Sequence, residues 1–303
     1  MDWFLQQLIN GLALGAIYAL IALGYTMVYG VLRFINFAHS DVLMLGAFAA
    51  YYLAPMVARV LGAASVPTAL VVMVLSAAIC AVIGMTIEFL AYRPLRHRPR
   101  LTVLITAIGV SLFIEYTGQH EKVFGAATKP FPELLPKKEI IMGAMRCSSN
   151  DLVVLALTAV LLAAMWFIVQ RTKIGMAMRA VSFNEQAASL MGVNVNAIIS
   201  FTFAIGSALA AIGGIFYSMR APGIEPLMGV QPGLRAFIAA VLGGIGNLPG
   251  AALGGLVLGL IETFFGGMPG LSDYRDGIAF ALLILILLFR PAGLLGKLQM
   301  EKV

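Results

Sequence analysis

Long apolar runs recur along this sequence and constrain its fold more than any other feature. They cover residues 4–32, 42–61, 66–92, 101–118, 152–170 and 197–219. A helix needs about 20 mainly apolar residues to cross a hydrocarbon core of about 30 Å, and these runs have that length. Because 61% of the residues are hydrophobic and only 11% are charged, a water-soluble globule is excluded. The sequence predicts an all-α, polytopic integral membrane protein.

Three polar loops between the runs predict the topology. Residues 93–100 carry four arginines, which is typical of a cytoplasmic loop, and Glu88 just before them is expected to pair with Arg93 or a neighbouring arginine as a structural contact. Crossing parity then places residues 119–150 outside and residues 171–196 in the cytoplasm. The net charge of +6 lies in such loops and not in one stripe, so membrane lipid is an expected partner and nucleic acid is not.

The apolar pattern changes over residues 234–266. Residues 234–244 are too short to cross, the Gly/Pro-rich residues 246–250 interrupt them, and residues 251–265 are short again. Discontinuous or re-entrant helices, as in many transporters, and a tight hairpin of two tilted short spans fit this pattern equally well. Eight or nine crossings are therefore expected in one membrane domain over residues 1–303.

The loop at residues 171–196 contains signals for a short helix. Ser182 and Glu185 have the spacing of a capping box, and Gly192 stands where a helix would end in the left-handed conformation. A helix over residues 183–191 would be only about 13 Å long and must dock on something to be stable. It could lie on the lipid surface or bind a partner protein, through its small and apolar side chains Ala187, Ala188, Leu190 and Met191.

Polar groups inside or beside apolar runs are candidates for a functional site. Asn36, His39 and Asp41 lie between the first two runs, where Asp41 could simply cap a helix that begins at Val42. Glu262 lies in the last short run and could face a pathway or sit at the interface. Both interpretations remain open for each of these residues.

The sequence contains no motif for chemistry of its own. It lacks the G-x-x-x-x-G-K-[ST] phosphate loop, the H-E-x-x-H zinc motif and the G-x-S-x-G nucleophile motif, and its two cysteines imply neither a disulfide framework nor a metal site. An enzyme is disfavoured, and no cofactor or metal is expected on this chain. If the protein moves a solute, the energy must come from another subunit or from an ion gradient.

Six stretches together resemble the LivH-type permeases of bacterial branched-chain amino acid importers of the ABC class, over nearly the whole length. They are GYTMVYG (24–30), INFAHSD (35–41), AYRPLR (91–96), GMAMRAVSFNEQAASLMGVNV (175–195), AAVLGGIGNLPGAALGG (239–255) and FRPAGLLG (289–296). The family has glycine where this chain has Ser40, which adds a side chain at an expected turn.

The resemblance implies a multi-pass permease of the bacterial inner membrane for branched-chain or other hydrophobic amino acids. It implies a second related permease, two cytoplasmic ATPase subunits that use ATP, and a periplasmic substrate-binding protein as partners. The cytoplasmic loop would couple the permease to an ATPase subunit and would move as a rigid lever. The coupling residues implied are Arg179, Ser182, Glu185, Ala188, Leu190, Met191 and Gly192.

A pathway for such substrates needs weak polar contacts in an apolar lining. The candidates are Asn36, His39, Asp41, Glu262 and a possible gate at Gly243 and Gly244. Two other functions stay open, namely an importer of urea or short amides in the same family and a self-contained ion-coupled carrier, which would transport without partners.

Overall fold

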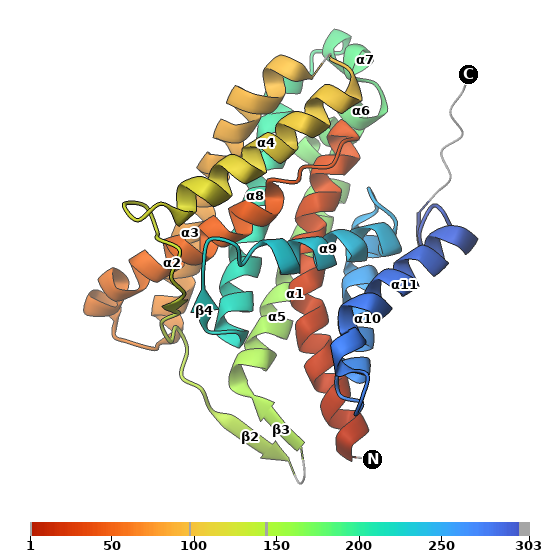
Figure 1. Cartoon of the computed structure of the whole chain (residues 1–303). Coiled ribbons are helices and arrows are strands. Elements are labelled where there is room, and N and C mark those ends of the chain that lie inside the picture. The colour runs from red at the N-terminus through yellow and green to blue at the C-terminus, as the bar shows by residue number, and fades with distance from the viewer. Residues whose placement is uncertain (1, 97, 143–144, 297–303) are drawn as a thin grey trace.

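The computed structural model describes residues 2–96, 98–142 and 145–296, so His97 of the arginine-rich loop lies outside the described residues. The fold is helical (Figure 1), which confirms the predicted class. The long helices are α1 (Asp2–Leu32), α2 (His39–Leu61), α3 (Val66–Ile87), α4 (Arg100–Gln119), α5 (Ser149–Arg171), α8 (Val195–Arg220) and α10 (Leu248–Gly266).

Shorter elements connect these helices. They are the π-helical turn η1 (Glu88–Tyr92), the 3₁₀ turns η2 (Arg93–Leu95) and η3 (Ser272–Tyr274), and the helices α6 (Lys173–Phe183), α7 (Glu185–Leu190), α9 (Val230–Gly243) and α11 (Arg275–Phe289). Four short strands form two antiparallel pairs, β1 (Lys129–Pro130) with β4 (Gly223–Ile224), and β2 (Glu139–Met142) with β3 (Met145–Ser148).

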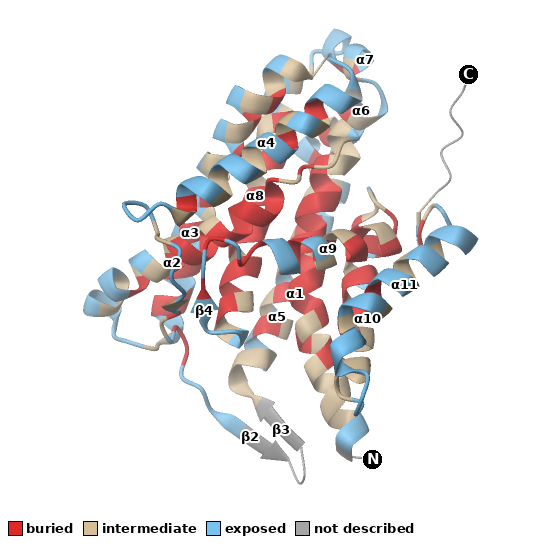
Figure 2. Cartoon of the chain, in the orientation of Figure 1, coloured by how far each residue is buried: buried red, intermediate tan, exposed pale blue. Residues whose placement is uncertain are grey.

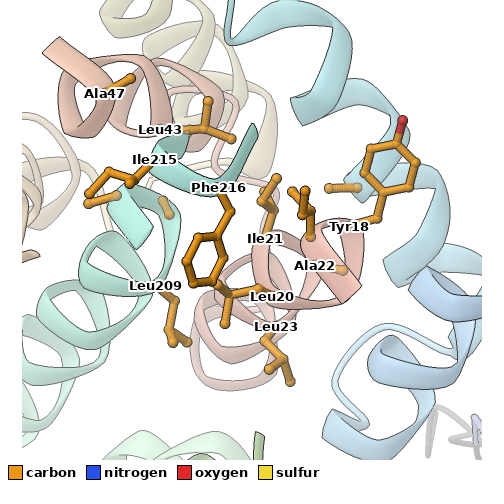
Figure 3. Packing of buried hydrophobic residues seen from close by; sticks show 14 of the residues in the cluster. Tyr18, Leu20, Ile21, Ala22, Leu23, Leu43, Ala47, Leu209, Ile215 and Phe216 are labelled. Carbon is orange, nitrogen blue, oxygen red and sulfur yellow. The ribbon is translucent and has the colours of Figure 1, made fainter. Parts of the chain in front are cut away.

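Helix α1 is the centre of the fold (Figure 2), and it contacts α5, α8, α9 and α10. Its apolar side chains interlock with those of neighbouring helices. Figure 3 shows Leu20 and Ile21 close to Phe216 of α8, and Leu43 of α2 close to Ile215 of α8. In contrast, α4 and α5 are mostly exposed and apolar, as expected for helices that face lipid. A small-residue seam lets α1 and α10 approach closely, because a Cβ atom on Gly259 would lie 2.3 Å from the Cα of Gly15.

Replacing Gly259 with leucine should therefore separate α1 from α10 and destabilise the protein. Overpacking of this kind costs about 1–3 kcal/mol, and here the obstacle is backbone, which cannot rotate away. The measurement is the midpoint of thermal unfolding in detergent. Gly109→Leu on α4 is the matched control, since a Cβ atom there meets nothing within 4 Å. Equal midpoints for the two variants would contradict the described seam.

Seven of the described helices are long and apolar enough to cross a membrane. Helices α9 and α11, with 14 and 15 residues, are about 21 and 22 Å long and too short to cross a 30 Å core alone. Whether the chain crosses eight or nine times depends on these two helices and stays a prediction.

The interruption near residue 246 is a turn between two antiparallel helices. Gly243 packs on Gly250, and Gly254 on Ala239, so α9 and α10 form a hairpin, while Gly244 and Gly246 have the positive φ angles that the turn needs. The prediction that the run over residues 251–265 forms a short helix was wrong. Helix α10 has 19 residues because it begins at Leu248: the side-chain oxygen of Asn247 accepts a hydrogen bond from the backbone N–H of Gly250 and caps the helix. Pro249 is tolerated because it lies in the first turn, where its missing N–H would have no partner within the helix.

Two predicted helix caps were also wrong. Ser182 lies inside α6, and Asn184 caps α7 by accepting from the N–H of Ala187 at 2.9 Å. Asp41 lies in the first turn of α2, which begins at His39. The left-handed conformation of Gly192 is confirmed, with φ of +84°.

The loops gather at two opposite ends of the molecule (Figure 1). Residues 171–196 and the end of α3 lie at one end, which we call the coupling end, and are joined by the ion pair between Arg96 and Glu185. The N-terminus and the β2–β3 hairpin lie at the opposite end, which we call the outer end. This arrangement agrees with the predicted topology, in which the two basic loops share one side.

Candidate functional site

The loop at residues 171–196 forms a protruding tip of two short helices, α6 and α7. Three large apolar side chains project from the tip: Phe183, Leu190 and Met191 are 89%, 88% and 84% exposed. Ala188, by contrast, is buried, and it packs with Val181 in a small cluster between the tip and the membrane helices. Of the predicted docking residues, Leu190 and Met191 are therefore exposed, whereas Ala188 packs α7 against the rest of the protein.

Arg96 joins the tip to the ends of two membrane helices. Its guanidinium donates to Glu88 at 2.7 Å, to Asn196 at 3.0 Å and to Glu185 at 3.5 Å, and Ser200 donates to the second oxygen of Glu88 at 2.6 Å. We call these five residues the Arg96 network. They belong to the end of α3, to α7 and to the first turns of α8.

Burial explains why the Arg96 network is ordered. The Glu88 side chain is fully buried, and a buried carboxylate is tolerated only when it is paired and hydrogen-bonded. The expected pairing of Glu88 with an arginine of the next loop is confirmed, with Arg96 as the partner, whereas Arg93 lies over the ring of Phe89. The sequence did not indicate that the same arginine also reaches α7.

Arg179 and Ser182 face the membrane helices instead of the tip. The guanidinium of Arg179 donates to the carbonyl of Val169 on α5, and the carbonyl of Ser182 accepts from Arg33 at 3.1 Å. Both residues line a small cavity of about 90 Å³ beside Gly246. These contacts hold α6 against the ends of α1 and α5.

Asn36, His39 and Asp41 are all buried, but each contacts a different part of the protein. Asn36 accepts from the hydroxyl of Tyr92 at 2.6 Å, a ring nitrogen of His39 lies 3.3 Å from the carbonyl of Ile21, and Asp41 accepts from Ser111 at 2.5 Å. Each of these three side chains has a hydrogen-bonding partner in the protein. These contacts tie the start of α2 to its neighbours, and whether the three residues also line a pathway stays a prediction.

Gly243 and Gly244 are closely packed. Gly243 lies against Gly250, and Gly244 lies against Gly293 and Gly296 after α11. They form the turn of the α9–α10 hairpin at the coupling end, and any gate there would have to move this hairpin as a unit.

Glu262 is buried near the outer end and forms ion pairs with two arginines. Its Oε1 lies 3.1 Å from Arg235 and 3.6 Å from Arg275, and Arg235 also donates to Asp276 at 2.7 Å and to Tyr18 at 3.2 Å. The sequence analysis missed both arginines. Arg235, an isolated charge within an apolar half-length run, carried the signal that could have found this cluster.

A family model described as "Branched-chain amino acid transport system / permease component" matches residues 7–287. This chain belongs to that family. As a member, it is a multi-pass protein of the bacterial inner membrane and its class is transport, in agreement with the seven apolar helices.

Full-length relatives support the same assignment. The chain is 42% identical over 305 residues to the high-affinity branched-chain amino acid transport system permease protein BraD of Pseudomonas aeruginosa, covering 99% of this chain and 98% of the relative. It is 38% identical over 310 residues to LivH of Escherichia coli, with the same coverage. The chain is 34% identical to the ribose import permease RbsC of Haemophilus influenzae over 134 residues, which is 42% of this chain and 41% of that one. No solved structure matches the chain.

Proposed function

We propose that this chain is the permease subunit of an ATP-driven importer of branched-chain or other hydrophobic amino acids. The relatives that match over nearly their whole length are permeases of high-affinity branched-chain amino acid transport systems, which supports this substrate class. The observation that carries the coupling role is the tip with exposed Phe183, Leu190 and Met191. Such a cluster on a short, firmly seated helix suits a cleft in a partner protein.

The proposed assembly contains this chain, a second related permease, two cytoplasmic ATPase subunits and a periplasmic substrate-binding protein. ATP would be bound and hydrolysed by the ATPase subunits, with no cofactor on this chain. Leu190 and Met191 would contact an ATPase subunit directly. Glu185 and Ala188 would hold α7 in place, and Arg179 and Ser182 would hold α6.

The Arg96 network offers a physical route for coupling. When an ATPase subunit moves α7, Glu185 moves with it, and Arg96 carries the displacement to Glu88, which begins η1 at the end of α3, and to the start of α8. Because α8 packs on both α1 and α2, a rigid displacement of its first turns changes the packing at the centre of the membrane domain. This would switch the pathway between its outward- and inward-facing states.

Leu190→Asp combined with Met191→Asp should prevent stable association with the ATPase subunits. The change places two charges where the proposal requires an apolar contact, and loss of central interface residues typically costs about 2 kcal/mol or more each. The measurement is copurification of the ATPase subunits with tagged permease. Val123→Asp, in the exposed loop that follows α4, is the control for an added surface charge. Undiminished copurification of the double variant would contradict the proposed contact.

The two alternative functions make different predictions for the same preparation. A carrier coupled to an ion gradient would transport without ATPase subunits, and an importer of urea or short amides would copurify with a binding protein that retains such a ligand. The ligand retained by the soluble partner therefore distinguishes among the substrate classes.

A further inference from the structure

A cavity of about 390 Å³ opens near the outer end of the molecule, between α1, α8, α9, α10 and α11. Its volume falls in the range of about 300–1,000 Å³ typical of small-molecule sites. Its lining combines charged and polar side chains with two tyrosines and a leucine. The lining residues used below are Leu14, Tyr18, Tyr217, Arg235, Glu262 and Arg275.

The charged groups of the cavity differ in how well they are satisfied. Arg235 is fully engaged, because it donates to Asp276 through two nitrogens and to Tyr18 through a third. Neither carboxylate oxygen of Glu262 accepts a hydrogen bond within the described part of the chain, and the buried Nε of Arg275 donates none there. The ion pairs of Glu262 therefore lack the geometry that normally compensates a buried carboxylate.

This combination suits a ligand that carries an ammonium group and a carboxylate on the same carbon atom. Glu262 offers a free acceptor for an ammonium group, and Arg275 offers a free donor for a carboxylate. A ligand with only one charge could form a hydrogen bond with only one of these two groups, whereas a zwitterion supplies a hydrogen-bonding partner for each. Leu14 and the rings of Tyr18 and Tyr217 provide apolar surface for a short hydrocarbon side chain.

We propose that this cavity binds an α-amino acid, with its ammonium group on Glu262 and its carboxylate on Arg275. The cavity lies at the end opposite the coupling loop, where a substrate arriving from outside would first meet the permease. The inference rests on the proposed function for the identity of the amino acid, and it adds the residues that hold the charged groups common to all α-amino acids. A site used in transit must release its ligand, so weak binding is expected.

The test uses the purified permease–ATPase complex in lipid nanodiscs, without its binding protein. The midpoint of thermal unfolding is measured with L-leucine, with leucinamide, which lacks the carboxylate, and with 4-methylpentanoate, which lacks the ammonium group. Leucine at about 10 mM should raise the midpoint, because a ligand that binds only the folded state stabilises it. For the same rise in the unfolding midpoint, the concentration of each singly charged analogue should have to be higher than that of leucine by about tenfold or more.

Arg275→Gln should remove the response to leucine, because it removes the guanidinium that would hold the carboxylate. The variant should still fold, because the Arg275 side chain is half-exposed and Arg235 continues to pair with Glu262. Arg59→Gln is the matched control, an exposed arginine in the last turn of α2 outside the cavity, and it should respond like the unmodified complex. Glu262→Gln should lose the preference for leucine over 4-methylpentanoate if the variant folds.

Three results would overturn the proposal: no shift with leucine, equal shifts with all three compounds, or an unchanged response in Arg275→Gln. The proposed function has a separate test, which is uptake by the complete importer with its binding protein. Normal leucine uptake by a complex that shows any of these three results would refute the cavity site alone. Absence of uptake for every hydrophobic amino acid would refute the proposed function.

Discussion

Arg96→Gln should abolish ATP-driven uptake and destabilise the protein. The change removes the group that joins α7 to α3 and α8, so movement of the tip would no longer reach the membrane helices. It also leaves the fully buried Glu88 with Ser200 as its remaining hydrogen-bond donor in the Arg96 network. Breaking one side of a buried ion pair costs about 3–5 kcal/mol. Uptake into proteoliposomes and the midpoint of thermal unfolding measure the two effects.

A second substitution separates the two effects. Adding Glu88→Gln to Arg96→Gln removes the uncompensated charge, so the double variant should recover much of the stability but none of the uptake. Arg98→Gln, which changes an exposed arginine of the same loop, should be normal in both assays. Recovery of uptake together with stability would mean that the Arg96 network serves the fold alone.

Ala188→Phe should uncouple ATP hydrolysis from uptake. Ala188 is 5% exposed and packs with Val181 and Ile199 beneath α7, so a ring at this position would lift the helix from its seat. The ATPase subunits could still bind the exposed tip and hydrolyse ATP, but their movement would reach a displaced helix. The assay compares ATP hydrolysis with uptake in the same proteoliposomes, and uptake per ATP should fall at least about tenfold, the effect of roughly 1.4 kcal/mol of lost coupling.

Ala187→Phe tests whether the burial of Ala188, and not an added ring anywhere on α7, causes the uncoupling. Ala187 is the adjacent residue on the same helix but is exposed, so the added ring meets solvent or partner instead of the seat of α7. If Ala188→Phe keeps both normal substrate-stimulated ATP hydrolysis and normal uptake, the role assigned to α7 is contradicted.

The helices and the placement of the basic loops could be predicted because they depend on long, local patterns. Apolar runs fix the membrane helices regardless of their partners, and the ion pair between Arg96 and Glu185 agrees with placing both basic loops on one side. The Gly192 turn was equally local, since glycine adopts positive φ at little cost.

Helix boundaries could not be read reliably where several residues could serve as caps. Ser182 and Asn184 both suit an N-cap, and the choice depends on where the preceding helix ends. Thr172 caps α6 at the N–H of Gly175, and α6 then continues through Ser182 to Phe183, which leaves Asn184 as the cap of α7.

The polar sites depend on contacts between distant segments, which spacing along the sequence cannot show. Glu262 was a candidate, but its partners come from other helices: Arg235 lies across the α9–α10 hairpin and Arg275 begins α11. Asp41 was interpreted as a cap because Ser111, its partner, lies 70 residues away on α4. The chemistry of these residues singled them out in the sequence, their contacts could be seen only in the structure, and a place in the pathway stays a prediction.

Under the proposed function, this chain transmits work done by separate ATPase subunits to the membrane helices. The most direct test is uptake of labelled leucine into proteoliposomes that contain the permease pair and both ATPase subunits, with binding protein outside and ATP inside. We predict uptake only when all components and ATP are present, and none by this chain alone under any ion gradient. Gradient-driven uptake by this chain alone, without ATP, would contradict the account.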